Sequence, residues 1–76
     1  MWEEKDNMLK RTFEFKDFIQ AWGFMNQVAM IAEKMDHHPN WSNVYHTVKI
    51  ELTTHDAGNT ITDKDRKLAA AIDALL

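Results

Sequence analysis

The segment Glu33-Lys34-Met35-Asp36-His37-His38-Pro39-Asn40-Trp41 separates a helical pattern before it from a strand pattern after it. Pro39 prevents a helix from continuing, and the residue before a proline is disfavoured in the helical region. We therefore expect the helix to end at or before His37, and His38 to be extended, so that the two imidazoles project differently. Adjacent histidines at the end of a helix make this segment the first candidate for a functional site.

The pattern before this segment predicts one long helix. Apolar residues recur every three or four positions from Phe18 to Met35, which is the spacing of one helical face. The predicted buried stripe is Phe18, Trp22, Met25, Val28 or Ala29, Ala32 and Met35. Gly23 lies inside this helix at a cost of roughly 0.5–1 kcal/mol relative to alanine, so we expect another helix or chain to approach closely there.

Alternating residues predict strands on both sides of the helix. Residues 2–5 favour a short edge strand, residues 8–15 a second strand, and residues 41–54 two further strands with a bend near Tyr45-His46. The apolar residues predicted to face inward are Leu9, Phe13 and Phe15 in the first half, and Val44, Val48, Ile50 and Leu52 in the second. Arg11 is the only polar residue on the apolar side of its strand.

A second helix is predicted after a loop at residues 56–60. Thr62 can cap its first turn, and Asp65 can complete a capping box three residues later. Its apolar stripe is Leu68, Ala71 or Ile72, and Leu75. The order β-β-α-β-β-α therefore predicts a single α+β domain over residues 1–76, with both helices packed on one face of a four-stranded antiparallel sheet.

The composition excludes several classes of protein. Apolar residues make up 45% of the chain and charged residues 28%, as in a folded domain. A formal charge of −3 argues against direct binding of nucleic acid, and no apolar run approaches the ~18 residues of a membrane span. The chain has no cysteine, which excludes disulfides and fits a cytoplasmic location. Because so short a chain builds a marginal core, we expect a homo-oligomer.

Three histidines are candidates for proton transfer, because an ordinary imidazole has a pKa of about 6.5. His37, His38 and His55 can converge if the last strand brings its end beside the end of the first helix. Each histidine taken alone is more often an ordinary surface residue. Imidazoles also bind zinc, but adjacent residues do not share a helix face, so the spacing does not favour a metal site.

The other candidates each have two interpretations. Glu33, four residues before His37, could orient that imidazole or be a solvated carboxylate on the helix surface. Trp41 and Tyr45 could stack on a flat ligand or pack within the sheet. Asp65 could support the site or only cap its helix.

The spacing of these residues resembles a known family. Glu33-x-x-x-His37-His38-Pro39, then five residues to Tyr45, nine more to His55 and nine more to Asp65, is similar to the signature of the pterin-4a-carbinolamine dehydratases. Animal members are also called dimerisation cofactors of a homeodomain transcription factor. The flanking stretches that agree are Phe15-Lys16-Asp17-Phe18, Trp22-Gly23-Phe24-Met25, Ala32-Glu33-Lys34 and Trp41-Ser42-Asn43-Val44-Tyr45. The family usually has a further helix before the position of Trp2, and we expect that helix to be absent here.

The resemblance implies helices on one side of a four-stranded antiparallel sheet, dimers that join sheets, and tetramers that form through helices. It implies a lyase that dehydrates 4a-hydroxytetrahydrobiopterin to quinonoid dihydropterin and so recycles tetrahydrobiopterin. No metal and no cofactor is expected. The alternative that the family also implies is a protein-binding module that stabilises the dimer of a partner, as a transcriptional coactivator does.

The resemblance also assigns roles to individual residues. His37 and His55 become the catalytic acid and base, and His38 joins the catalytic set as a substrate contact that positions the pterin. Pro39 and residues 54–57 would line the pocket. The full set of expected substrate-binding residues is Glu33, His37, His38, Pro39, Trp41, Thr54, His55, Asp56, Ala57 and Asp65.

Overall fold

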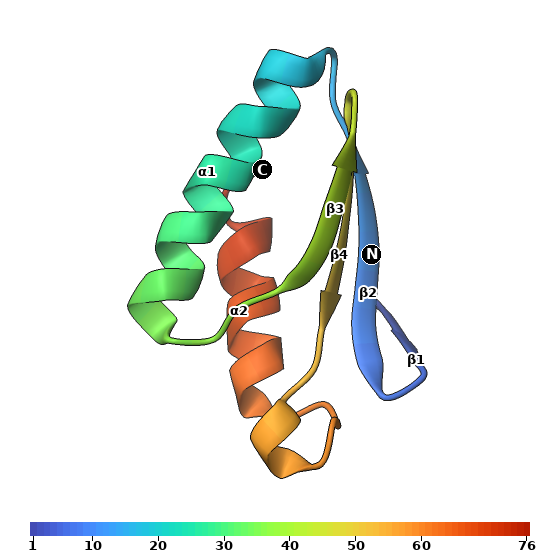
Figure 1. Ribbon diagram of the computed structural model, residues 1–76, viewed down its shortest axis with the longest axis vertical. Helices are drawn as coiled ribbons and strands as arrows, with labels where there is room; N and C mark the ends of the chain where they lie inside the picture. The colour runs from blue at the N-terminus through green and yellow to red at the C-terminus, as the bar shows by residue number, and fades with distance from the viewer.

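The computed structural model describes residues 1–76 and confirms the predicted α+β fold. Its elements are β1 (Glu3–Lys5), β2 (Met8–Glu14), α1 (Phe18–Met35), β3 (Asn40–Val44), β4 (Thr47–Leu52), a 3-10 turn η1 (His55–Ala57) and α2 (Asp63–Asp73). All strand pairs are antiparallel in the order β1-β2-β4-β3, and both helices lie on one side of the sheet (Figure 1). Neither helix is long and apolar enough to cross a membrane.

Alternation along β2 and β4 directs apolar side chains toward the helices, where they form the core. The buried strand residues are Leu9, Phe13, Val48, Ile50 and Leu52, and Phe15 packs against them at the edge. Arg11 also lies on this side, where its guanidinium stacks 4.6 Å from the ring centroid of Phe13 and donates to Asp73 at 2.7 Å. These contacts explain how the charged side chain of Arg11 is accommodated on the apolar face of β2.

The inward orientation predicted for Val44 is wrong. Val44 pairs directly with Thr47 across the two-residue turn, and directly opposed residues share a face of the sheet. Since Thr47 precedes the buried Val48, both Thr47 and Val44 face away from the core, and Val44 is 75% exposed. The two-residue turn therefore places Val44 on the opposite face of the sheet from Val48, although the sequence spacing suggests one shared face.

Helix α1 begins and ends close to the predicted positions. The Asp17 side chain caps it by accepting the Gln20 backbone N–H at 2.9 Å, and Asp36 ends it in the left-handed conformation with φ 52°. The buried stripe is Ala21, Phe24, Met25, Val28 and Ala32. The predicted burial of Phe18 and Trp22 is wrong, because the true stripe starts from Ala21 and leaves these two rings stacked on each other outside the core.

Gly23 has no close neighbour within the chain. A Cβ atom built on Gly23 would meet nothing within 4 Å, so the close approach predicted from this glycine does not occur within the chain. The residue instead lines a shallow hollow beside Phe15 and the last residues, Leu75 and Leu76.

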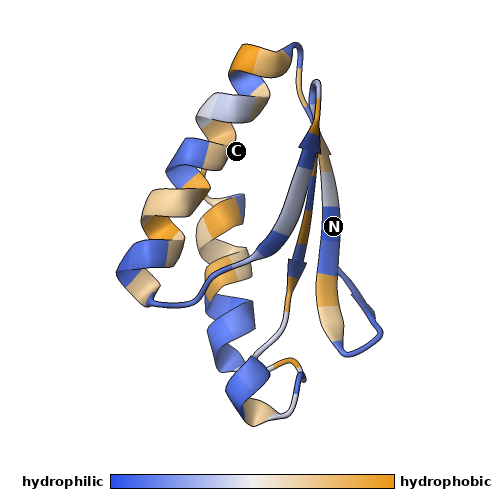
Figure 2. Cartoon of the chain, in the orientation of Figure 1, coloured by the Kyte–Doolittle hydropathy of each residue, from blue (hydrophilic) through white to orange (hydrophobic).

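Helix α2 is fixed by its first turn and by its apolar face. Thr62 and Asp65 form the predicted capping box. Leu68, Ala69 and Ile72 are buried, so Ile72 rather than Ala71 continues the predicted stripe. Figure 2 shows apolar residues alternating with hydrophilic ones on both helices, as expected for helices with one buried face.

Candidate active site

A polar hollow of about 360 Å³ lies where the end of α1, the start of β3, the end of β4 and the start of α2 meet. These segments come together at the lower end of Figure 1, next to η1. The lining residues are Asp36, His37, His38, Pro39, Asn40, Thr53, Thr54, His55, Asp56 and Lys64. His37, His38 and His55 therefore reach one hollow from segments distant in the sequence.

The antiparallel pairing of β3 with β4 causes this convergence. The first residue of β3, Asn40, pairs with Glu51 near the end of β4, so the residues before β3 lie beside the residues after β4. The left-handed Asp36 and then Pro39 turn the chain from α1 into β3 within a few residues. The sequence predicted that His37, His38 and His55 can converge if the last strand ends beside the end of the first helix. The structure meets this condition.

His37 is held by a buried carboxylate. Its Nε2 lies 2.5 Å from Oδ1 of Asp65, whose side chain is fully buried, while the side chain of His37 is 11% exposed. Oδ2 of Asp65 accepts the Thr62 backbone N–H at 2.9 Å and the Thr54 hydroxyl at 2.8 Å. Asp65 therefore caps α2 and supports the hollow at once, so both interpretations of this residue hold.

Two opposing effects act on the pKa of Asp65. Burial raises it, because desolvation disfavours the charged form. Hydrogen bonds from His37, from the Thr62 backbone and from Thr54 lower it, and together they hold the pKa of Asp65 below its ordinary value of 3.8. The carboxylate is therefore ionised at neutral pH, and it faces His37 as an acceptor.

The other two imidazoles have exposed partners. His38 Nε2 lies 2.8 Å from Oε1 of Glu33, and His55 Nδ1 lies 2.6 Å from Oδ1 of Asn59. Of the two interpretations of Glu33, the one in which it orients His37 is wrong: the left-handed Asp36 takes the chain off the helical path before His37, and the exposed Glu33 carboxylate contacts His38 instead. No three His, Asp or Glu side chains lie together as a possible set of metal ligands.

Six of the expected site residues line the hollow, and four do not. The lining residues are His37, His38, Pro39, Thr54, His55 and Asp56. Glu33 lies outside and contacts His38, Trp41 packs against the core, and Asp65 lies behind His37. Ala57 lines a neighbouring hollow instead.

Four further residues line the hollow that were not predicted from the sequence: Asp36, Asn40, Thr53 and Lys64. Each is a sequence neighbour of a residue that was identified, and this adjacency was the available signal. Tyr45, by contrast, belongs to the motif but lies in the turn at the far end of β3, where its ring centroid is 4.6 Å from that of His46.

This arrangement can bind a small polar ligand and exchange protons with it. Imidazoles donate and accept protons near neutral pH, and the hollow presents one that is fixed by a carboxylate and two that are exposed. Fold and site together define a small α+β protein with a histidine-lined hollow suited to acid–base chemistry.

Comparison with known proteins identifies the family. Residues 1–75 match the family model described as pterin 4 alpha carbinolamine dehydratase, and the chain belongs to this family. A relative from Synechococcus sp. (strain WH7803), provisionally named a pterin-4-alpha-carbinolamine dehydratase, is 57% identical over 74 residues, which cover 97% of this chain and 78% of the relative. A relative with the same provisional name from Rhodopseudomonas palustris (strain BisB18) is 60% identical over 67 residues, covering 88% and 65% of the two chains.

Two solved structures share the fold. The crystal structure of a transcriptional coactivator/pterin dehydratase from Brucella melitensis matches with a TM-score of 0.90 and 45% identity, over 96% of this chain and 79% of that one. A pterin dehydratase-like protein described as a RuBisCO assembly factor in the alpha-carboxysome matches with a TM-score of 0.79 and 28% identity, over 99% and 86% of the chains. Proteins described by different functions therefore share this fold.

Proposed function

We propose that this protein is a hydro-lyase that dehydrates a 4a-hydroxytetrahydropterin to the quinonoid dihydropterin, and thereby recycles tetrahydrobiopterin in the cytoplasm. The observation that carries the proposal is the meeting of His37, His38 and His55 at one polar hollow, with His37 fixed by the buried Asp65. Family membership supports the choice of a pterin carbinolamine as substrate.

The chemistry of dehydration suits this set of side chains. The hydroxyl group must leave as water, so it needs a proton, while a pterin ring nitrogen loses one. His37 and His55 are the two groups proposed to share the roles of acid and base, and each well-placed proton transfer contributes roughly 10²–10⁴ in rate. His38 positions the pterin, and Pro39 and Thr54 line the hollow next to the histidines.

The direct test is a stopped-flow absorbance assay with freshly generated 4a-hydroxytetrahydropterin. The wild-type chain should raise the dehydration rate well above the uncatalysed rate. His37→Ala and His55→Ala should each lower it roughly 10²–10⁴-fold, because each removes one proton-transfer group.

His46→Ala is the matched control for this assay, since His46 lies outside the hollow and pairs with the exposed Glu14 at 3.3 Å. It should keep the wild-type rate. A His55→Ala variant with the wild-type rate would remove His55 from the proposed chemistry, and a wild-type chain without activity would overturn the proposed function.

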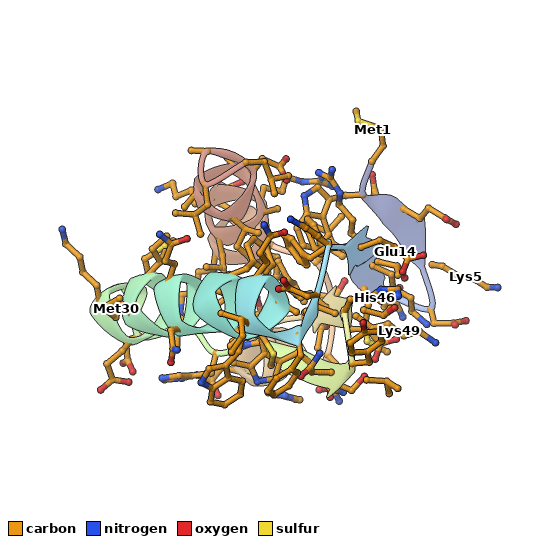
Figure 3. All side chains as sticks on the ribbon, turned by 90° about the horizontal axis from the view of Figure 1, so that it is seen from above. Met1, Lys5, Glu14, Met30, His46 and Lys49 are labelled. Carbon is orange, nitrogen blue, oxygen red and sulfur yellow. The ribbon has the colours of Figure 1, made fainter.

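A second candidate function is association through α1. Phe18, Ile19, Trp22 and Met30 are large apolar residues that α1 leaves exposed, and Met30 lies toward the end of this helix away from the sheet in Figure 3. Exposed apolar residues that gather on one element are typical of interaction surfaces. We propose that this face joins copies of the chain into a homodimer or homotetramer, or stabilises the dimer of a protein partner.

The association is tested by sedimentation velocity. Trp22→Lys should shift the wild-type protein toward smaller species, because a charge replaces an apolar ring in the proposed interface. An unchanged distribution would show that this face is not used between copies of the chain. Gln27→Lys serves as the matched control for an added charge, because Gln27 is exposed on the same helix but lies beside Phe24 and Leu75, away from the face of Trp22 and Met30.

A further inference from the structure

The side chains behind His37 form a chain of hydrogen bonds whose direction can be assigned. The Thr54 hydroxyl has one hydrogen and donates it to Oδ2 of Asp65 at 2.8 Å. Its oxygen lies 2.7 Å from the Thr62 hydroxyl oxygen, so the hydrogen of that bond must come from Thr62. The Thr62 oxygen in turn accepts the Lys64 backbone N–H at 3.3 Å. All donors in this chain therefore point toward Asp65.

This direction fixes the hydrogen between Asp65 and His37. Oδ2 of Asp65 already accepts two donors, the Thr54 hydroxyl and the Thr62 backbone N–H. The carboxylate is ionised, as its low pKa indicates, and it carries no hydrogen to donate. The 2.5 Å contact must therefore use a hydrogen on Nε2 of His37.

The second ring nitrogen of His37 is left open. Nε2 is the only nitrogen of this ring that makes a hydrogen bond in the structure. No buried side-chain nitrogen or oxygen lacks a hydrogen-bond partner, so the unpaired Nδ1 is not buried. His37 is only slightly exposed and lines the hollow. An Nδ1 atom that is both unpaired and accessible is therefore available to a ligand there.

We propose that the hydrogen-bond chain from Thr62 through Thr54 to Asp65 locks His37 in the Nε2–H tautomer, so that Nδ1 is the nitrogen that accepts a proton from the ligand. This assignment rests on the proposed function for the identity of that ligand. His37 is then the base, and Thr54 and Asp65 are positioning residues that act through it. A hydrogen bond to one ring nitrogen of a histidine commonly sets the tautomer, and so decides which nitrogen can accept a proton from a ligand.

The proton balance of the dehydration follows from this tautomer. Nδ1 of His37 takes a proton from a pterin ring N–H, whose electron pair forms a C=N bond as the C–O bond to the hydroxyl breaks. His55 in its protonated form gives its proton to the leaving hydroxide, and water is released. His37 ends as an imidazolium beside the Asp65 carboxylate, and proton exchange with solvent restores both histidines.

Asp65→Asn tests this tautomer assignment, because an amide at position 65 should favour the opposite tautomer of His37. The Thr62 backbone N–H can only donate, so the amide oxygen should take the place of Oδ2 and put the amide NH₂ group against His37. Nε2 must then accept, which moves the hydrogen of the neutral ring to Nδ1. We expect kcat to fall roughly 10²–10⁴-fold with a smaller change in KM, as when a histidine base is held in the wrong tautomer.

The tautomer is read from long-range ¹H–¹⁵N spectra of the uniformly labelled full chain, at a pH where the histidines are neutral. A His37→Gln variant assigns the signals of His37. We expect a protonated Nε2 and a bare Nδ1 in the wild type, and the reverse in Asp65→Asn. A protonated Nδ1 in the wild type, or an Asp65→Asn spectrum like that of the wild type, would overturn the proposal.

Thr54→Val provides a second variant in case Asp65→Asn does not fold. It removes the hydroxyl donor to Asp65, and we expect a roughly 10-fold fall in kcat, as for loss of an outer-shell partner of a histidine. Thr54→Ser should restore the rate, whereas a merely structural role for the threonine methyl group would not be rescued. Thr47→Val is the matched control, because Thr47 donates to the exposed Glu14 at the same 2.8 Å distance outside the hollow.

The two proposals can fail separately. The spectra require no substrate, so an inactive wild type would overturn dehydration while the tautomer could still be read. If the wild type dehydrates the carbinolamine and Asp65→Asn keeps the wild-type rate with an inverted tautomer, Nδ1 is not the base and only this inference is overturned.

Discussion

A histidine, a threonine and a carboxylate meet at two places in this fold, with different results. At the hollow, His37 and Thr54 both contact Asp65, whose side chain is fully buried. At the β3–β4 turn, His46 and Thr47 both contact Glu14, whose side chain is 66% exposed. The histidine–carboxylate distance is 2.5 Å in the first group and 3.3 Å in the second.

The difference teaches that composition alone does not make a site. Glu14 and His46 lie close together on the sheet side of the molecule, open to water (Figure 3). Water screens this pair and competes for its hydrogen bonds, so its geometry is weakly fixed. Asp65 has no access to water, so its neighbours must supply every donor and each of them is held in place. Burial of the carboxylate therefore fixes the positions of the histidine and the threonine that contact it.

Removal of the two carboxylates should give the largest contrast. Asp65→Ala leaves His37 and the Thr54 hydroxyl without their buried partner, and we expect a loss of about 3–5 kcal/mol in the free energy of unfolding. Glu14→Ala should cost only about 0–1 kcal/mol, because its partners turn to water. Urea unfolding of both variants measures the two losses. Equal losses would contradict the comparison.

Removal of the two threonine hydroxyls should give a smaller contrast of the same sign. Thr54→Val takes one donor from a buried carboxylate, which should cost about 1–3 kcal/mol. Thr47→Val should change the unfolding free energy by less than about 0.5 kcal/mol, as usual for an exposed site. Denaturant midpoints at equal m-values report this difference, and a Thr47→Val loss as large as that of Thr54→Val would refute it.

The acid dependence of stability should also distinguish the two carboxylates. The pKa of Asp65 in the fold lies below its ordinary value of 3.8, so the unfolded chain binds a proton more readily than the folded one. Its contribution is therefore fully present above the ordinary value and is lost as the pH falls through the lower pKa of the folded state. Asp65→Asn should flatten the fall of unfolding free energy in this acidic range.

Glu14→Gln is the control for the acid series. Its side chain is exposed, so it should leave the slope of unfolding free energy against pH close to that of the wild type. The interpretation fails if Asp65→Asn keeps the wild-type slope while Glu14→Gln flattens it.

A small effect is also expected at His38, one of the two exposed histidines of the hollow. His38 contacts Glu33, whose side chain is 81% exposed. Glu33→Gln should therefore change the unfolding free energy by less than about 1 kcal/mol. Thermal unfolding measures it, and a loss comparable to that of Asp65→Ala would show that the exposed pair is far more important than its exposure indicates.

The order of helices and strands could be predicted from the sequence, because the spacing of apolar residues changes clearly at Phe18. Before it, apolar residues recur every two positions, and after it they recur every three or four. The errors have local causes. Phe18 and Trp22 fit a helical stripe as well as Ala21 does, and only packing against the sheet decides which stripe is buried. Val44 fits the alternation of β4 but precedes the turn that reverses it.

The candidate site could be predicted only in part. Adjacent histidines before a proline are visible in the sequence, and His55 and Asp65 are candidates from their residue types and positions. The family resemblance adds their roles. The contact between His37 and Asp65 spans 28 residues and requires the antiparallel return of β4, which no local pattern specifies. Lys64 and Thr53 enter the hollow only because their neighbours do.

The most direct test of the central claim uses the four histidines as reporters in one spectrum. A dihydropterin that cannot be dehydrated is added to the labelled protein, and the imidazole ¹H–¹⁵N signals are followed. We predict that the signals of His37, His38 and His55 shift together along one saturation curve, while that of His46 stays in place. Saturating ligand that shifts His46 alone, or that leaves all four signals unchanged, would contradict a pterin site in the hollow.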